Sequence, residues 1–298
     1  MIRAGAALLL ALAGTADAPP TLISVPAQHA VVEGIATDGR TVWLSSVVDR
    51  TILTHDRGKA GRFAMPAGTL HPMGLAWDAA RQWLWIATDC PRLPAIARCE
   101  SGALVALDRK GRLRMKLSPG PGFHPDDVSV GGGSVFVSDS QNSAVYRLDR
   151  GASTLETLIA PGTGRSAQGT ALMSNGKYLL VADYGRGIAV IDLASKARLP
   201  LPKADGKPLL GIDGLVRVGE DYYGVHNGSS PGSLIRFRID GIKIDVTVVH
   251  RGAPLADPTQ LAVDGKRLLV VADAGWPAAS KPEVPARGAD TVVAFDLP

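Results

Sequence analysis

Three features are scarce in this 298-residue sequence. The only cysteines, Cys90 and Cys99, do not form a Cys-x-x-Cys pair, which argues against a zinc or dithiol redox motif. After residue 18, no apolar run approaches the roughly 18 residues that a membrane-spanning helix needs. No segment of about ten residues or more has the apolar periodicity of an amphipathic helix, so helices that connect parallel strands are not expected.

A concentrated basic surface is also lacking, although the formal net charge is +4. In the densest basic segment, residues 109–116, Arg and Lys alternate with Leu113 and Met115 at a period of two. This alternation is typical of an outer edge strand whose charged side chains face water. The alternative is a nucleic-acid patch, but the interleaved aromatic residues that stack on bases are missing. We therefore expect no nucleic-acid partner.

The first 18 residues have the pattern of a secretory signal. Arg3 supplies a positive charge, residues 4–14 are mainly apolar, and residues 16–18 (Ala-Asp-Ala) form a small-x-small cleavage site. We expect a mature chain of residues 19–298 that is periplasmic or secreted, with no membrane association after cleavage. In such a compartment the two cysteines are expected to form a disulfide that pins their loop.

A repeated unit is clearest in residues 168–193, QGTALMSNGKYLLVADYGRGIAVIDL. A short apolar run reaches the turn Asn175-Gly176, a second run covers residues 178–182, and a third ends at Asp192. Two residues of the type Asn-Gly between β-prone runs are a strong hairpin signal. The unit is therefore predicted to be a small antiparallel meander.

Six such units occur, with a period of roughly 40 to 50 residues. Each continues from its first apolar pair through a turn and a second strand to a third strand that tends to end in Asp. Fourth strands are predicted near residues 63, 113–117, 155–159 and 242–249. The units start at Glu33, Met73, Asp126, Gln168, Asp213 and Thr259.

Many short, evenly spaced strands without crossover helices predict an all-β, closed fold, and six four-stranded units predict a six-bladed β-propeller. The sixth unit ends after its third strand, whereas residues 22–25 precede the first unit. We expect residues 22–25 to supply the outermost strand of the last blade, which closes the ring and covers an exposed edge. Residues 19–298 then form a single domain.

The first residues of the six units should meet at one mouth of the channel that the first strands line. Glu33, Asp126 and Asp213 are carboxylates, and Gln168 is an amide. Carboxylates gathered in a partly buried hub repel one another unless a cation lies between them. Oxygen donors favour Ca²⁺ over Mg²⁺ or Mn²⁺, with Zn²⁺ as a further alternative. The competing interpretation is that these side chains only solvate a water-filled mouth.

Short motifs at these positions resemble a known family. Glu33-Gly34 in the first unit, an amide at Gln168 and Asp213-Gly214 in the fifth unit are similar to the SMP-30/gluconolactonase group, which includes luciferin-regenerating-type proteins. Paraoxonases and strictosidine-synthase-like proteins are more distantly similar. The resemblance extends over essentially the whole mature chain and implies a calcium-dependent six-bladed propeller.

The resemblance also implies roles for individual residues. Glu33, Gln168 and Asp213 are expected to ligate the metal, and Asp126 is expected to lie near the metal or substrate. Two positions depart from the family pattern: the group usually has Asn where this chain has Gln168, and Asn-Asp-Gly where the third unit starts with Asp126-Asp127.

The chemistry that the resemblance implies is hydrolysis of a lactone or related cyclic ester. Asp213 is then the candidate general base, and His226, in the loop after the second strand of the fifth unit, is the alternative. Candidate substrate contacts are Asp126, Asp127, His71, His124, Asp183, Tyr184 and Trp276.

Each of these contacts has a structural alternative. The two histidines precede first strands and either approach the substrate or occupy exposed turns. Asp183 and Tyr184 either contact the ligand or cap their loop. Trp276 lies in the long loop of residues 273–290, which is either a partial lid or a variable surface loop.

Two functions remain open at this point. The first is an exported, metal-dependent hydrolase with a small-molecule substrate. The second is a non-catalytic propeller that binds a small molecule or a partner protein and holds a structural metal, because propellers serve both uses. A monomer is favoured in either case.

Overall fold

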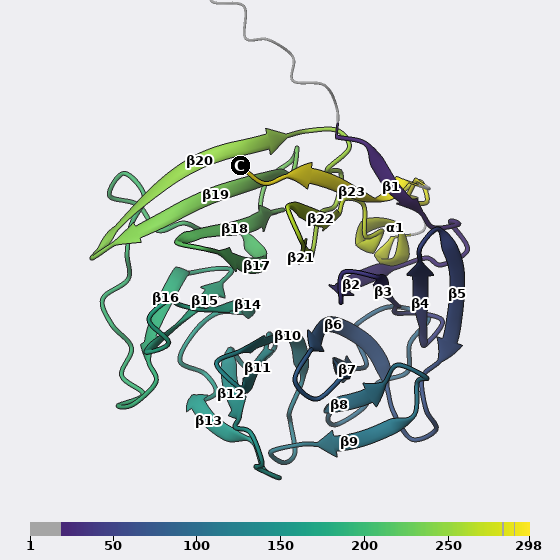
Figure 1. Cartoon of the computed structure of the whole chain (residues 1–298), viewed down its shortest axis with the longest axis horizontal. Helices are drawn as coiled ribbons and strands as arrows, with labels where there is room; N and C mark the ends of the chain where they lie inside the picture. The colour runs from purple at the N-terminus through teal and green to yellow at the C-terminus, as the bar shows by residue number, and fades with distance from the viewer. Residues whose placement is uncertain (1–18, 282, 289) are drawn as a thin grey trace, which may run out of the picture.

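Six β-sheets surround a central channel in a computed structural model that describes residues 19–281, 283–288 and 290–298 (Figure 1). The predicted signal segment, residues 1–18, lies outside the described residues. The inner strands β2, β6, β10, β14, β17 and β21 contact one another in a closed ring. The prediction of an all-β six-bladed propeller is therefore confirmed.

Each blade is an antiparallel sheet whose strands follow one another outward from the channel. Blade one contains β2 (Val32–Thr37), β3 (Thr41–Ser46), β4 (Thr51–Asp56) and β5 (Lys59–Ala64). Blade two contains β6 (His71–Asp78), β7 (Trp83–Asp89), β8 (Ala103–Asp108) and β9 (Leu113–Leu117). Blade three contains β10 (Pro125–Gly131), β11 (Ser134–Asp139), β12 (Ala144–Leu148) and β13 (Glu156–Ile159).

The remaining blades vary more. Blade four has three strands, β14 (Ala167–Leu172), β15 (Tyr178–Asp183) and β16 (Gly187–Asp192). Blade five contains β17 (Ile212–Val218), β18 (Asp221–His226), β19 (Ser233–Asp240) and the long outer strand β20 (Lys243–Arg251). Blade six contains β21 (Leu261–Asp264), β22 (Arg267–Val271), β23 (Asp290–Asp296) and β1 (Thr21–Ser24).

The first and last strands of the chain close the ring. β1 pairs antiparallel with β23, with Thr21 opposite Val293, as expected for an N-terminal strand that completes the last blade. The buried Arg287 guanidinium donates to the backbone carbonyls of Val25 and Pro26, which holds the segment after β1 in place. At the hub, Thr259 Oγ1 donates to the Glu33 carbonyl at 3.1 Å, so blades six and one are also linked at the channel.

The core lies between blades and not within them. In β15, the consecutive residues Leu179, Leu180 and Val181 are all fully buried. Leu180 packs in a cluster with Ile212 of blade five, whereas Leu179 and Val181 pack in a cluster with Phe136 of blade three. Successive residues of a strand point to opposite faces, so each middle strand joins two neighbouring blades.

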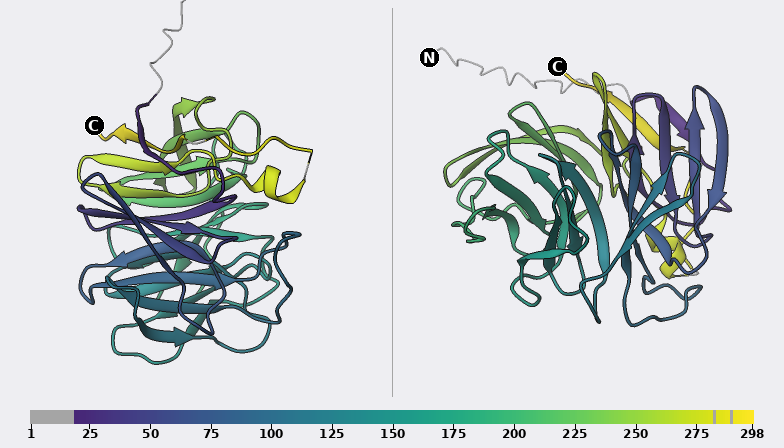
Figure 2. Two further views of the ribbon diagram at one scale, coloured as in Figure 1. Left: turned by 90° about the vertical axis from the view of Figure 1, so that its right-hand side faces the viewer. Right: turned by 60° about the horizontal axis from the view of Figure 1, so that its bottom comes forward.

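Local expectations are largely met. β9 lies at the outer edge of blade two, and Arg114 and Lys116 are exposed, as predicted for a charged edge strand. The loop after β22 contains a five-residue helix, α1 (Trp276–Ser280), that the sequence patterns did not predict, and Figure 2 shows this yellow helix projecting from one face of the ring. No helix in the described part of the chain is long and apolar enough to cross a membrane.

Candidate functional site

A cavity of about 470 Å³ opens where the inner strands begin. Five residues proposed from the sequence line it: Glu33, Asp126, Gln168, Asp213 and Trp276. The first four come from four different blades, and Trp276 comes from α1 above them. The register of the repeats thus brings together the oxygen-bearing side chains that were expected to meet.

The carboxyl groups of this mouth are held in an environment that disfavours their charge. Burial, followed by the negative charges of Asp213 and Asp126, raises the pKa of Glu33 well above its usual range. Burial and the charge of Asp126 do the same to the pKa of Asp213. Burial raises the pKa of Asp126 to about 6. No Lys or Arg among the described residues forms an ion pair with any of the three.

Hydrogen bonds orient these side chains from outside the ring. The Trp276 indole Nε1 donates to Glu33 Oε2. Asn227 Nδ2 donates to Asp213 Oδ2 at 2.8 Å, and this bond lowers the pKa of Asp213 against the effect of burial. Gln168 Nε2 donates to Ser166 Oγ at 3.0 Å, and a hydrogen bond from the Gln168 side chain also lowers the pKa of Asp126 against the effect of burial.

The donors at this mouth fit a hard cation. They are carboxylate and amide oxygens, the ligands that Ca²⁺ prefers. Asn227 Oδ1 is buried and has no hydrogen-bond partner, an arrangement that a cation beside Asp213 would relieve. Taking one carboxylate oxygen each from Glu33, Asp126 and Asp213, the three atoms do not all lie within 4.8 Å of one another in the described structure.

A disulfide shapes one side of the cavity. Cys90 and Cys99 are bonded, as predicted, and Pro91 and Arg92 of the loop between them line the cavity. Arg92 is the one cation among the described lining residues. Because the sulfur atoms beside Asp89 are bonded to each other, this cluster is a structural bridge and not a metal centre.

The predicted histidine contacts do not line the cavity. His71 Nδ1 lies 2.8 Å from the backbone oxygen of Val47. His124 lies behind the cavity wall, with Nδ1 3.0 Å from Oδ1 of the lining residue Asp89. His226 is half-buried at the end of β18, and burial lowers its pKa. None of the three histidines is among the residues that line the cavity.

Asp183 and Tyr184 also lie outside the lining. The buried Asp183 carboxylate accepts the backbone N–H groups of Arg165 and Ser166, which is the loop-capping alternative. Tyr184 is half-buried, and burial followed by the charge of Asp213 raises its pKa. Asp127 differs most from expectation: it is buried and lines a separate cavity further along the channel.

Several lining or supporting residues were not singled out from the sequence, among them Asp89, Arg92 and Asn227. Asn227 is the first residue after β18, directly beyond His226, and it is this loop residue that supports Asp213. Arg92 lies in the loop of residues 89–101, which is expected from the sequence to shape the pocket as the other loops after second strands do, but no pattern distinguishes Arg92 within it. The only sequence signal for Asn227 and Arg92 is their position in loops that follow second strands.

Comparisons with known proteins identify the fold. No known family matches the sequence, and no curated protein is detectably similar to it in sequence. Solved structures do match: the PQQ-bound aldose sugar dehydrogenase from Streptomyces coelicolor has a TM-score of 0.63 at 13% identity, covering 94% of this chain and 99% of that one. This chain has the same β-propeller fold as the solved structures that match it.

Two further solved structures also match over most of their length at low sequence identity. Regucalcin from Agrobacterium tumefaciens, described as a calcium-binding protein, has a TM-score of 0.62 at 18% identity, with 90% of each chain covered. A luciferin-regenerating enzyme has a TM-score of 0.63 at 12% identity, with 93% of each chain covered. At these identities the similarity concerns the fold alone.

Proposed function

We propose that this protein is an exported, calcium-dependent hydrolase that acts on a lactone or a related cyclic ester. One observation carries the proposal: carboxyl and amide groups from four blades line one cavity, and its carboxyls Glu33 and Asp213 have raised pKa values and no cationic partner. Such a site is costly to build unless a bound cation compensates the charge.

The residues have distinct roles in this proposal. Glu33, Gln168 and Asp213 hold the ion, and Asp126 lies beside it. When bound, the ion supplies Lewis-acid polarisation of a carbonyl and acidifies water. Oxygen donors favour Ca²⁺, with Mg²⁺, Mn²⁺ and Zn²⁺ as alternatives in decreasing agreement with the donor set.

Side chains at the cavity accept the proton of the attacking water and bind the substrate. Asp213 accepts the proton of the water whose oxygen attacks the carbonyl carbon, and it returns that proton to the ring oxygen when the ring C–O bond breaks. Asn227 holds the Asp213 carboxylate in place through the 2.8 Å bond. His226, the alternative base, does not line the cavity. Arg92 binds oxygen atoms of the substrate at the rim, because it is the one cation among the described lining residues.

The structural neighbours support the proposal in general terms. One is named a calcium-binding protein and two are named as enzymes, and all have this fold. Two further features fit export: the Cys90–Cys99 disulfide and the secretory pattern of residues 1–18. Recovery of a chain that starts near Pro19 from the periplasm or medium is expected, and recovery of the uncleaved chain in the cytoplasm contradicts export.

The alternative function is a non-catalytic propeller that binds a small molecule or a partner protein with a structural ion. The same oxygen donors would serve it, because the fold does not determine whether catalysis occurs. The two functions differ in one consequence: only the hydrolase releases acid from a lactone in a chelator-sensitive manner.

A panel of sugar and aliphatic lactones therefore tests the proposal, with acid release followed by a pH indicator. We expect turnover that a chelator abolishes and added Ca²⁺ restores, and that Asp213→Asn lacks. Asp245→Asn, which removes an exposed carboxylate of β20, serves as the matched control with unchanged turnover. Bound metal without chelator-sensitive turnover on any lactone would favour the binding function.

A further inference from the structure

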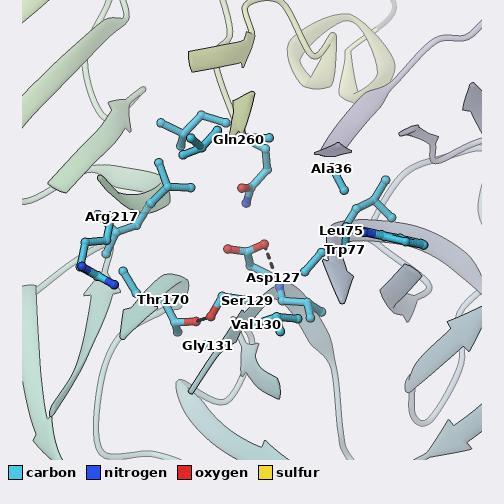
Figure 3. Close-up of a pocket in the computed structure, with 18 of the residues that line it drawn as sticks. Ala36, Leu75, Trp77, Asp127, Ser129, Val130, Gly131, Thr170, Arg217 and Gln260 are labelled. Atoms are coloured by element: carbon cyan, nitrogen blue, oxygen red, sulfur yellow. Dashed lines mark hydrogen bonds between the residues drawn. The ribbon is translucent and has the colours of Figure 1, made fainter. Parts of the chain in front are cut away.

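The channel has a second cavity at its other end. Its volume is about 350 Å³, and later residues of the six inner strands line it. The first cavity, which we call the acidic mouth, is lined by Glu33, Asp126, Gln168 and Asp213 at the start of their strands. Figure 3 shows the Asp127 carboxyl and the Gln260 carboxamide pointing toward each other near the middle of the second cavity. Neither residue lines the acidic mouth, so the two cavities are separate.

The two polar residues occupy positions where the other blades have glycine. In blades one, two, four and five, the second residue of the unit is Gly34, Gly74, Gly169 or Gly214. In blades three and six it is Asp127 or Gln260. Asp127 and Gln260 therefore place the only side chains of this ring in the channel, from opposite blades.

Neighbouring glycines make room for these side chains. A Cβ atom at Gly74 would lie 2.5 Å from Asp127 Oδ1, and one at Gly214 would lie 2.8 Å from Gln260 Oε1. Either contact is too close for any side chain. The backbone is thus shaped to hold one carboxyl and one carboxamide.

The walls of the cavity carry both apolar and polar groups. Leu75, Ala171, Leu215 and Leu261 contribute to its walls. The hydroxyls of Ser129 and Thr170 are engaged with each other at 2.6 Å.

The polar part of the wall around Asp127 has acceptors and no cation. Asp127 Oδ1 accepts the backbone N–H of Val128 at 2.8 Å, and the Gln260 carboxamide donates a hydrogen bond to the Asp127 carboxyl, which lowers the pKa of that group against the effect of burial. Among the described residues, no Lys, Arg or His forms an ion pair with Asp127. Arg217 at the exposed rim donates to the Gly219 carbonyl. The buried carboxyl therefore has hydrogen-bond partners but no cationic partner among the described residues.

We propose that this cavity binds a small primary ammonium compound with an apolar body. The ammonium group pairs with the Asp127 carboxylate, and the Gln260 carboxamide offers a second acceptor. The apolar body lies against the apolar part of the wall, to which Leu75 and Leu215 contribute. An inorganic cation matches this site less well, because the apolar walls cannot replace its hydration shell. This proposal does not depend on a metal or on catalysis at the acidic mouth.

Calorimetric titration with benzylamine tests the site, with benzyl alcohol as the uncharged probe of equal size. Saturating CaCl₂ is present throughout, so that an amine attracted to the acidic mouth meets an occupied site. We expect benzylamine to bind with one-to-one stoichiometry and at least 10-fold more tightly than benzyl alcohol. Equal binding of the two probes, or no binding of benzylamine, would overturn the proposal.

Two matched substitutions locate the binding. Asp127→Asn keeps the acceptor for the Val128 N–H group. It should weaken the binding of benzylamine at least 10-fold and change the affinity for benzyl alcohol less than 3-fold. Asp213→Asn, which removes a carboxyl of the acidic mouth, should change the affinity for benzylamine less than 3-fold. The reverse pattern would place the amine in the acidic mouth and contradict the assignment.

Discussion

Asp213 combines two properties that are usually separate in a carboxylate. It lines a solvent-accessible cavity, yet burial and neighbouring negative charge raise its pKa. A cation would reverse that effect by favouring the ionised form. The residue can then be ionised in the loaded protein, and it is oriented by the amide of Asn227.

Asn227→Ala should weaken calcium binding and lower turnover, each by about 10-fold (~1.4 kcal/mol), because Asp213 loses the bond that holds and ionises it. Since this bond lowers the pKa of Asp213, its loss should also move the pH dependence of calcium affinity to higher pH. Calorimetric titration of Ca²⁺ between pH 5 and pH 8 measures both.

The matched control is Asn175→Ala, in an exposed turn of blade four, which should leave calcium affinity unchanged. An unshifted pH profile in Asn227→Ala would show that the bond does not tune Asp213.

Asp127 gives a stability prediction that is independent of any ligand. Burial raises its pKa from 3.8 to about 7, so its contribution to stability is complete below about pH 4 and is lost as pH rises towards 7. Asp127→Asn should therefore be as stable as the wild type at pH 4 and more stable by about 2 kcal/mol or more at pH 8. Urea unfolding in chelator measures this difference. A difference that does not change with pH would contradict the prediction.

At this scale, the sequence predicts some residues better than others. Glu33, Asp126, Gln168 and Asp213 could be found because a repeat register fixes which residue starts each inner strand. The orientation of loop side chains has no such periodic signal, so Asn227 was missed in favour of its neighbour.

The inner strands are the elements that position both cavities, and close backbone approach sets their spacing. A Cβ atom at Gly34 would lie 2.3 Å from the Met73 carbonyl oxygen, and one at Gly169 would lie 2.6 Å from the Asp213 carbonyl oxygen. The glycine after the first residue of a unit thus lets the next blade pack directly against it. This gives a physical reason for the repeat pattern that revealed the fold.

Gly34→Ala should destabilise the protein by about 2 kcal/mol or more, because the added methyl meets backbone atoms of blade two that cannot move aside. Calcium affinity should also fall, since Glu33 precedes this position. The control is Gly288→Ala, where the Cβ would meet only Asp273 Oδ2 at 3.8 Å and a change within about 0.5 kcal/mol is expected. Equal stability of the two variants in thermal unfolding would show that blade spacing tolerates a side chain.

Strands were easier to predict than loops for the same reason. Alternating apolar runs and turn residues such as Asn175-Gly176 mark the hairpins directly. Helix α1 was missed because five residues, two of them Trp276 and Pro277, are too few to establish a helical period. The fourth strand of blade four is replaced by a single bridge between Ile191 and Arg198, which no local pattern predicts.

For the whole molecule, ring closure is the feature on which the fold depends. β1 covers the edge of β23 and buries Ile23 and Val25, which are 7% and 4% exposed. A chain that starts after residue 25 should melt roughly 10 °C lower than a chain that starts at Pro19, because two buried side chains and an edge pairing are lost. Differential scanning calorimetry of the two chains measures this effect. Equal melting temperatures would mean that the sixth blade does not need its N-terminal strand.

The closure could be predicted because the sixth unit lacked a strand and residues 22–25 lacked a partner. The separation of the two cavities along the channel could not, because it depends on which side chains replace glycine inside the closed ring.

Calorimetric titration of Ca²⁺ into chelator-treated protein tests the central claim, a cation site at the acidic mouth, most directly. We predict one saturable site that Glu33→Gln and Asp213→Asn each weaken at least 100-fold and that Asp127→Asn leaves within 3-fold. No calcium binding by the wild type, or binding that survives both substitutions at the acidic mouth, would contradict the account.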